Sequence, residues 1–118
     1  MSKWFVVLLM AALTVLACDS VWNAPTPTKV EYRVTGSTRG VNITYANAYE
    51  GTSQVEDCGI PWSYSWTGGR SGQFLYVSAQ NEYDFGSVTV SIYVNDDLWK
   101  TSTSSGAYVI ATAYGSKP

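Results

Sequence analysis

Cys18 is the residue whose chemistry is most clearly specified by the residues around it. It follows one basic residue, Lys3, and an apolar stretch over residues 4–16. A basic start, a short apolar run and a small residue before the cleavage site are the parts of a secretory signal peptide. The apolar run is shorter than the roughly 20 residues that a membrane-spanning helix needs. We therefore predict that residues 1–17 are a signal peptide and that the rest of the chain is exported.

The run Val15-Leu16-Ala17-Cys18 predicts that the exported chain carries a lipid. It resembles a bacterial lipobox, in which the cysteine sulfur receives a diacylglycerol before a peptidase cuts ahead of the cysteine. An ordinary signal peptidase also accepts this bond, because Val15 and Ala17 meet its preference for small or apolar residues. In that alternative the mature chain begins with a free thiol. We interpret the leader as a lipoprotein signal peptide and Cys18 as the lipidation site.

Cys58 is the only other cysteine in the chain. A disulfide between Cys18 and Cys58 is one alternative, because exported chains enter an oxidising compartment. A lipidated Cys18 has no free sulfur, and Cys58 is then an unpaired, partly buried apolar residue. A catalytic thiol needs a base, and the chain contains no histidine.

Three groups of carboxylates are candidates for acid–base or metal chemistry. They are Glu56-Asp57, Glu82 with Asp84, and Asp96-Asp97. Adjacent carboxylates on a strand or turn point apart, so spacing alone makes none of these groups a catalytic pair. Asp96-Asp97 fits a tight hairpin, and Glu82 with Asp84 is a minor candidate for a weak calcium site.

A serine or threonine nucleophile would need a lysine as its base in a chain without histidine. Lys29, Lys100 and Lys117 lie near the tether, beside a hairpin and at the C-terminus, and we expect none to be buried beside a serine. The sequence also has no phosphate-binding loop and no metal-ligand cluster of histidine and cysteine. We predict a binding protein rather than an enzyme, without metal or cofactor, and keep a small hydrolase as a third alternative.

Four aromatic residues around a glycine-rich turn form a candidate ligand or partner surface. They are Trp62, Tyr64, Trp66 and Tyr76. Strand alternation places the first three on one face. Core filling is the simpler interpretation for a small domain. The alternative is an exposed aromatic strip for a sugar, lipid or protein partner.

The exported part of the chain is small and mildly acidic. From Cys18 onward it has six lysine and arginine residues against nine acidic ones, a net charge of −3. The sequence has no basic cluster, so we predict no binding to nucleic acid and no electrostatic hold on anionic lipids. Residues 18–28 contain two prolines and little apolar content, which predicts an extended, lipid-anchored tether. Residues 29–118 fit a single domain.

Alternating apolar and polar residues predict about eight short strands, separated by turn residues. The expected strands cover residues 30–35, 41–46, 52–56, 62–67, 74–80, 88–94, 98–103 and 107–114. Short strands at this spacing favour an all-β fold, an antiparallel β-sandwich of about seven to eight strands. The residues expected between the sheets are Val34, Ile43, Trp62, Leu75, Val77, Val90, Ile92 and Val109.

Several segments, in this order and spacing, resemble the MmpS family, the mycobacterial membrane protein small family, and related bacterial lipoproteins. They are Val30–Gly36, Asn42–Tyr45, Ile60–Ser63, Ala79–Asn81, Gly86 with Val88, Val90 and Ile92, and Ser104–Val109. The resemblance spans about residues 29–115. Mycobacterial members carry an uncleaved transmembrane helix, whereas this chain has a short leader that ends in a lipobox.

The resemblance implies an immunoglobulin-like β-sandwich outside the cytoplasmic membrane. It also implies an accessory role to a resistance-nodulation-division transporter of the MmpL type, and it supplies no catalytic residues. The first hypothesis is therefore a membrane-anchored accessory module of the cell envelope. The alternative is a secreted or surface β-sandwich that binds a glycan or protein and has no transporter partner.

Overall fold

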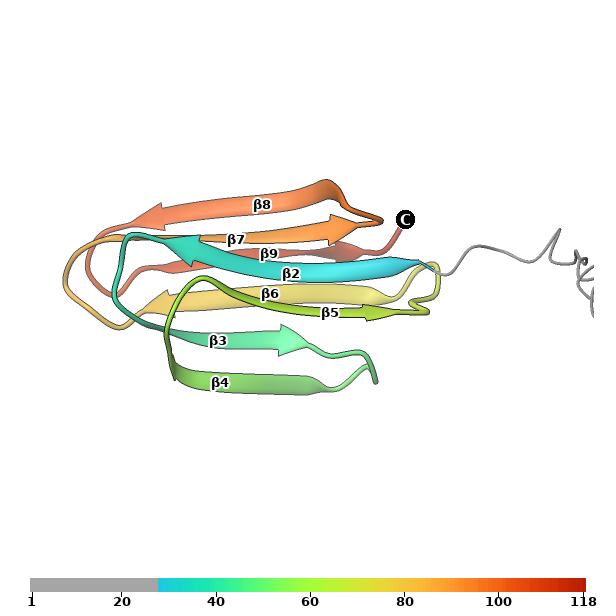
Figure 1. The fold of residues 1–118 in the computed structure, drawn as a ribbon, viewed down its shortest axis with the longest axis horizontal. Coiled ribbons are helices and arrows are strands. Elements are labelled where there is room, and N and C mark those ends of the chain that lie inside the picture. The colour runs from blue at the N-terminus through green and yellow to red at the C-terminus, as the bar shows by residue number, and fades with distance from the viewer. Residues whose placement is uncertain (1–27) are drawn as a thin grey trace, which may run out of the picture.

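The computed structural model describes residues 28–118, and every regular element in this part of the chain is a β-strand. Figure 1 shows the strands lying lengthwise in two layers. Their bounds are β2 Lys29–Gly36, β3 Val41–Ala46, β4 Thr52–Cys58, β5 Trp62–Thr67, β6 Phe74–Asn81, β7 Ser87–Val94, β8 Asp97–Ser105 and β9 Ile110–Ser116.

The eight strands form two antiparallel sheets of four. The first sheet has the order β5-β2-β7-β8 and the second has the order β4-β3-β6-β9. The backbones of the two sheets approach each other at β6 with β7 and at β8 with β9. These features confirm the predicted antiparallel β-sandwich.

Alternation along each strand sends apolar side chains between the sheets. Val30, Tyr32 and Val34 of β2 are fully buried, whereas Arg33 and Thr35 are exposed. The same alternation holds in β3, β6, β7 and the start of β9. The buried apolar core comprises Val30, Tyr32, Val34, Val41, Ile43, Tyr45, Leu75, Val77, Ala79, Val88, Val90, Ile92, Ala111 and Ala113.

Two of the eight residues predicted for the core are only partly buried. Trp62 packs against the core but lies on β5, which is an edge strand. Val109 precedes the last strand, which begins at Ile110 and not at Ala107 as the sequence pattern predicted. The chain turns just before β9, where Tyr108 has a φ of 55°. The alternation signal at residues 107–109 therefore belongs to a turn.

The strand directions give the sandwich two different ends (Figure 1). The proximal end holds the chain entry at Thr28, the β3–β4, β5–β6 and β7–β8 connections, and the C-terminus. Gly68 N–H donates to the carbonyl of Thr28 there, at 2.9 Å. The distal end holds the β2–β3, β4–β5, β6–β7 and β8–β9 connections. Strands of up to eight or nine residues separate the two ends by roughly 26 Å.

Candidate functional site

Three of the four predicted aromatic site residues lie together between the sheets. Trp62, Tyr64 and Trp66 occupy alternate, half-buried positions on β5. Tyr45 of the opposite sheet has its ring 5.2 Å from that of Trp62 and 4.6 Å from that of Tyr64. This aromatic row therefore fills the space between the sheets on the β5 side, which favours the core-filling interpretation over an exposed strip.

Tyr32 is the centre of this aromatic packing, and the sequence pattern did not single it out. Its side chain is fully buried on β2, and its ring centroid lies 5.4 Å from that of Trp66 and 5.9 Å from that of Tyr45. Its hydroxyl donates to the carbonyl of Ala46 at 2.7 Å and accepts from the Tyr76 N–H at 3.3 Å. Tyr32 thereby links the first sheet to β3 and β6 of the second.

Burial of Tyr32 makes the stability of the fold sensitive to alkaline pH. Burial disfavours the phenolate and raises the pKa of Tyr32 from 10.0 to about 12. When the pKa is higher in the folded state than in the unfolded state, the protonated group contributes its full stabilisation below the unfolded-state pKa. This contribution is lost as the pH rises through the folded-state pKa. We expect the free energy of unfolding in urea melts to fall by roughly 2–3 kcal/mol at most between pH 10 and 12 through this group. Tyr32→Phe should remove that part of the pH dependence, and an unchanged profile in the variant would contradict the assignment.

Trp66 carries the one buried side-chain polar atom without a hydrogen-bond partner within residues 28–118, its indole Nε1. Trp66 pairs with Val30 near the proximal end of β5. The indole N–H can only donate a hydrogen bond. The faces of the neighbouring aromatic rings are weak acceptors for it. The aromatic row therefore contains one buried donor without a hydrogen-bond partner.

Tyr76 is separated from the other three predicted residues. It points to the outer face of the second sheet, where its ring centroid lies 6.0 Å from that of Phe74 and where Tyr114 is its partner on β9. A shallow groove of about 430 Å³ lies on this face at the proximal end. Its lining residues are Thr44, Ala46, Glu50, Gly51, Thr52, Phe74 and Tyr76.

An ion pair connects two loops beside this groove. The guanidinium of Arg70 donates to both carboxylate oxygens of Glu50, at 2.6 and 3.0 Å. Both side chains are largely exposed, so the pair adds little stability and mainly fixes the relative positions of the two loops. The groove thus combines aromatic rings with threonine hydroxyls and a carboxylate at one rim.

The candidate acidic residues do not converge on a catalytic or metal centre in the described part of the chain. Glu82 accepts a hydrogen bond from Asn42 Nδ2 at 2.6 Å, and Asp96 pairs with Lys29 at 3.0 Å. Within residues 28–118 no three residues of histidine, cysteine, aspartate or glutamate gather as metal ligands would. The weak calcium site considered for Glu82 and Asp84 therefore gains no support from the geometry.

Lys117 differs from Lys29 and Lys100 in its burial. Lys117 is buried, with 5% of its surface exposed, because its aliphatic stem packs over Gly69. Long side chains commonly bury their methylenes in this way. Its Nζ donates to the carbonyl of Pro118 at 3.1 Å, so the ammonium group caps the chain end instead of activating a serine.

A buried asparagine organises the distal end, and the sequence pattern did not identify it as a functional residue. Asn81 is fully buried at the end of β6. Its Nδ2 donates to the carbonyls of Phe85 and Gly106, at 2.8 and 2.9 Å. Its Oδ1 accepts from the hydroxyl of Thr38 at 2.5 Å and from the Tyr83 N–H at 2.9 Å. One side chain therefore ties together the β2–β3, β6–β7 and β8–β9 loops.

The loops that Asn81 connects carry exposed aromatic residues. Tyr83 and Phe85 have ring centroids 6.0 Å apart, and the guanidinium of Arg39 lies 5.6 Å from the Tyr83 ring. Tyr108 is 57% exposed and Phe85 is 48% exposed. We call Arg39, Tyr83, Phe85 and Tyr108 the distal aromatic patch. The signal that could have revealed it is an isolated asparagine at the end of an otherwise apolar strand face.

Cys58 ends β4 at the distal end, and its thiol has no disulfide partner within residues 28–118. Its Sγ donates to the carbonyl of Gly59 at 3.2 Å, and burial raises its pKa. A raised pKa reduces the thiolate fraction at neutral pH, so Cys58 is a poor nucleophile. Cys18, with the lipidation and disulfide alternatives that rest on it, lies outside the described residues.

Comparison with known protein families gives a match over most of the chain. Residues 10–114 match the family model described as Mycobacterium membrane protein. A comparison with curated proteins found no match. Between residues 28 and 118 the structure has no helix with the length and apolarity to cross a membrane. The family match covers most of the chain, including part of the apolar leader.

Proposed function

Because the chain belongs to the Mycobacterium membrane protein family, the MmpS family, we propose that it is a lipid-anchored accessory protein of a resistance-nodulation-division transporter of the MmpL type. It acts by binding, outside the cytoplasmic membrane, and not by catalysis. The observation that carries this proposal is the family match, which runs from the leader through nearly the whole sandwich.

The arrangement of the chain supports an anchor at one end of a rigid domain. The described chain enters the sandwich at Thr28, at the proximal end (Figure 1). Thr28 is the tenth residue after Cys18, the proposed lipid site, and an extended chain of ten residue steps spans at most about 36 Å. The proximal end is therefore held near the membrane, and the distal end is presented away from it.

The side-chain geometry supports a binding role. Three carboxylates of the described part are each paired with one other side chain: Glu82 with Asn42, Asp96 with Lys29, and Glu50 with Arg70. Carboxylate-based hydrolysis needs two acids that face each other across a cleft. The polar network around Asn81 holds loops in place and involves no nucleophile with a base.

Replacing Cys18 tests the anchor. We expect Cys18→Ala to abolish incorporation of a fatty-acid probe and to release the protein to the soluble extracytoplasmic fraction or leave its leader uncut. Each buried lipid methylene contributes about 0.8 kcal/mol, so two or three acyl chains hold a protein firmly. Cys58→Ala is the matched control and should keep both label and membrane fraction. Unlabelled wild type with a Cys18–Cys58 disulfide in mass spectrometry would refute the lipid anchor.

Co-purification tests the transporter partner. An affinity-tagged MmpL-type transporter from the same cell should retain the full-length chain in mild detergent. An unrelated tagged membrane protein should not retain it. Absence of the chain from the transporter fraction, under conditions where both proteins are expressed, would contradict the accessory role.

The groove on the outer face favours one alternative, a ligand-binding sandwich without a transporter. Phe74 and Tyr76 provide aromatic rings, and Thr44 and Thr52 provide hydroxyls beside them. Aromatic rings with a few polar groups are the usual lining of small-molecule sites. Saturable binding of a soluble glycan that Tyr76→Ala abolishes would favour this alternative over the accessory role.

A further inference from the structure

We propose that the distal aromatic patch is the surface that docks on the transporter, and that it fits an extracytoplasmic protein surface with apolar pockets rimmed by basic residues. This inference rests on the proposed accessory function and adds the contact surface and the chemistry of the partner.

The patch is held rigid before any partner binds. Asn81 bonds to residues of three loops. Further backbone bonds join the same loops, from the Gly106 N–H to the carbonyl of Gly86 at 2.9 Å and from the Tyr108 N–H to that of Tyr83 at 3.0 Å. Preorganised loops lose little conformational entropy on binding, which improves affinity.

Close approach of the loops leaves no room for adjustment. Gly86 has a φ of 99°, and a Cβ placed there would lie 2.9 Å from Cα of Thr38. The β2–β3 and β6–β7 loops therefore pack backbone against backbone. A surface that only needed to be soluble would not require this fixed geometry, whereas a recognition surface benefits from it.

The patch has the composition of a protein interface centre. Tyrosine, phenylalanine and arginine are enriched in such interfaces, and a few of them provide most of the binding energy. Here Tyr83, Phe85 and Tyr108 are 38%, 48% and 57% exposed, respectively. Ile110, which is 54% exposed, extends the apolar surface onto the neighbouring face. Folding within the domain therefore leaves these apolar side chains uncovered at the distal end, and it leaves Tyr49, Phe74 and Tyr114 exposed outside the patch.

Tyr108 is exposed although its backbone is strained. Its φ of 55° lies in the left-handed region, which is unfavourable for a bulky side chain. Glycine or asparagine would suit this turn better. The tyrosine side chain is therefore not explained by the needs of the turn. Strained residues cluster at binding and active sites, so this exposed, strained tyrosine is consistent with a contact role.

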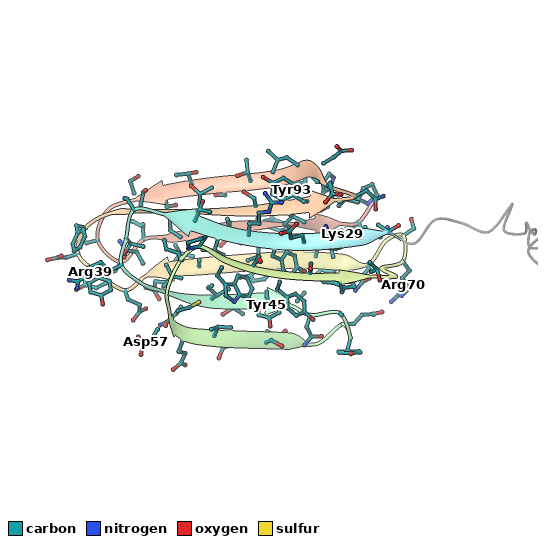
Figure 2. All side chains as sticks on the ribbon, viewed as in Figure 1. Lys29, Arg39, Tyr45, Asp57, Arg70 and Tyr93 are labelled. Atoms are coloured by element: carbon teal, nitrogen blue, oxygen red, sulfur yellow. The ribbon has the colours of Figure 1, made fainter. Side chains whose placement is uncertain are left out.

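The charges around the patch specify the partner. Asp57 and Asp84 are exposed at the distal end, and Glu56 is exposed nearby on β4. Arg39 is the cation within the patch, and its guanidinium lies over the Tyr83 ring. Figure 2 shows Arg39 and Asp57 at the end opposite Lys29 and Arg70. The rim is therefore net acidic and complements lysine or arginine residues on the partner.

The position of the patch fits an extended partner. The sandwich separates its two ends by roughly 26 Å, and the tether adds at most about 36 Å. The patch can therefore reach a protein surface up to about 60 Å from the membrane. A lipid surface lies toward the opposite end of the domain.

Site-specific photo-crosslinking tests the contact. A photo-reactive phenylalanine analogue replaces Phe85 or Tyr108 in the full-length chain, in cells that express the tagged MmpL-type transporter. Tyr49 and Tyr114, which are 91% and 60% exposed outside the patch, are the control positions. We expect crosslinks to the transporter at least about tenfold stronger from the patch than from the controls, as a buried interface centre requires.

Tyr108→Gly separates a binding role from a structural one. The glycine relieves the left-handed strain, so we expect the midpoint of thermal unfolding to rise by roughly 2–5 °C. The same change should weaken co-purification with the transporter by about tenfold, because it removes an exposed aromatic anchor. Tyr49→Ala should change neither quantity. A variant that is less stable, or that binds as well as wild type, would overturn the assignment of Tyr108.

The outcomes distinguish this inference from the proposed function. Crosslinks to the transporter from Tyr49 or Tyr114 alone would overturn the docking surface and leave the accessory role intact. Failure of the wild-type chain to co-purify would overturn both. Crosslinks from the patch to a second copy of the chain, without the transporter, would replace the proposed partner by self-association.

Discussion

Replacing Tyr32 with alanine is expected to lower the free energy of unfolding by about 3–5 kcal/mol, as removal of a large buried aromatic ring does. Tyr32 is fully buried, and its ring packs against Tyr45, Tyr64 and Trp66. The substitution leaves a cavity between the sheets. It also leaves the carbonyl of Ala46 without its donor. A domain of this size is stabilised by only about 5–15 kcal/mol, so the loss is a large fraction of the total.

Two variants separate the contributions at Tyr32. Tyr32→Phe keeps the ring and removes the hydroxyl, so we expect a loss of about 1 kcal/mol for the hydrogen bonds. Tyr49→Ala removes a tyrosine that is 91% exposed and should cost less than about 0.5 kcal/mol. Urea melts fitted with a shared m-value give the change in the free energy of unfolding for Tyr32→Ala, Tyr32→Phe and Tyr49→Ala. A loss below about 1 kcal/mol for Tyr32→Ala would show that Tyr32 is not the centre of the packing.

Replacing Asn81 with alanine is expected to lower the free energy of unfolding by about 2–4 kcal/mol, the cost of leaving partly buried polar groups without partners. The carbonyls of Phe85 and Gly106 lose their donor, and the Thr38 hydroxyl loses its acceptor. The three loops that carry the distal aromatic patch are then no longer joined by one side chain. The same variant should therefore bind its partner more weakly than its stability alone explains.

Asn81→Asp provides a sharper version of this test. The carboxylate keeps the size of the amide but directs an anionic oxygen at the carbonyls that Nδ2 now satisfies. We expect it to destabilise at least as much as Asn81→Ala at neutral pH, since a buried charge facing acceptors is costly. Stability should partly return at low pH, when the protonated carboxyl can donate. Gln54→Ala, at an exposed amide on β4, is the control and should change little. Equal stability of Asn81→Asp and wild type would contradict the network.

The alternation of apolar residues determined most of the strand layout. Val30, Tyr32 and Val34 are buried on one face of β2, and Val88, Val90 and Ile92 are buried on one face of β7. This period of two needs only local geometry, because successive side chains of a strand point to opposite faces. The hairpin between β7 and β8 was also predictable, since Asn95 and Asp96 both adopt positive φ values that asparagine and aspartate tolerate.

The family and the candidate anchor were likewise readable from the sequence. The segments quoted for the MmpS resemblance lie within residues 10–114, which the family model matches. The order and spacing of these motifs are properties of the sequence, so they are recognised without a structure. Cys18 also depends on local residues alone, and its lipidation stays a prediction.

Only the tertiary structure decided which aromatic residues act together. Trp62, Tyr64, Trp66 and Tyr76 are near one another in sequence, yet the first three lie between the sheets and Tyr76 lies on an outer face. The reason is that β5 and β6 belong to different sheets, and strand order is fixed by contacts between residues far apart in the chain. The alternation of residues predicts which side chains share a strand face. Only the packing of the sheets determines which residues that face contacts.

The distal end shows most clearly that local sequence patterns do not predict contacts between distant residues. Asn81 bonds to Thr38 and Gly106, which are separated from it by 43 and 25 residues. The distal aromatic patch draws its residues from three loops, and no local pattern joins them. Its existence follows from the way two sheets close on each other and bring those loops to one end.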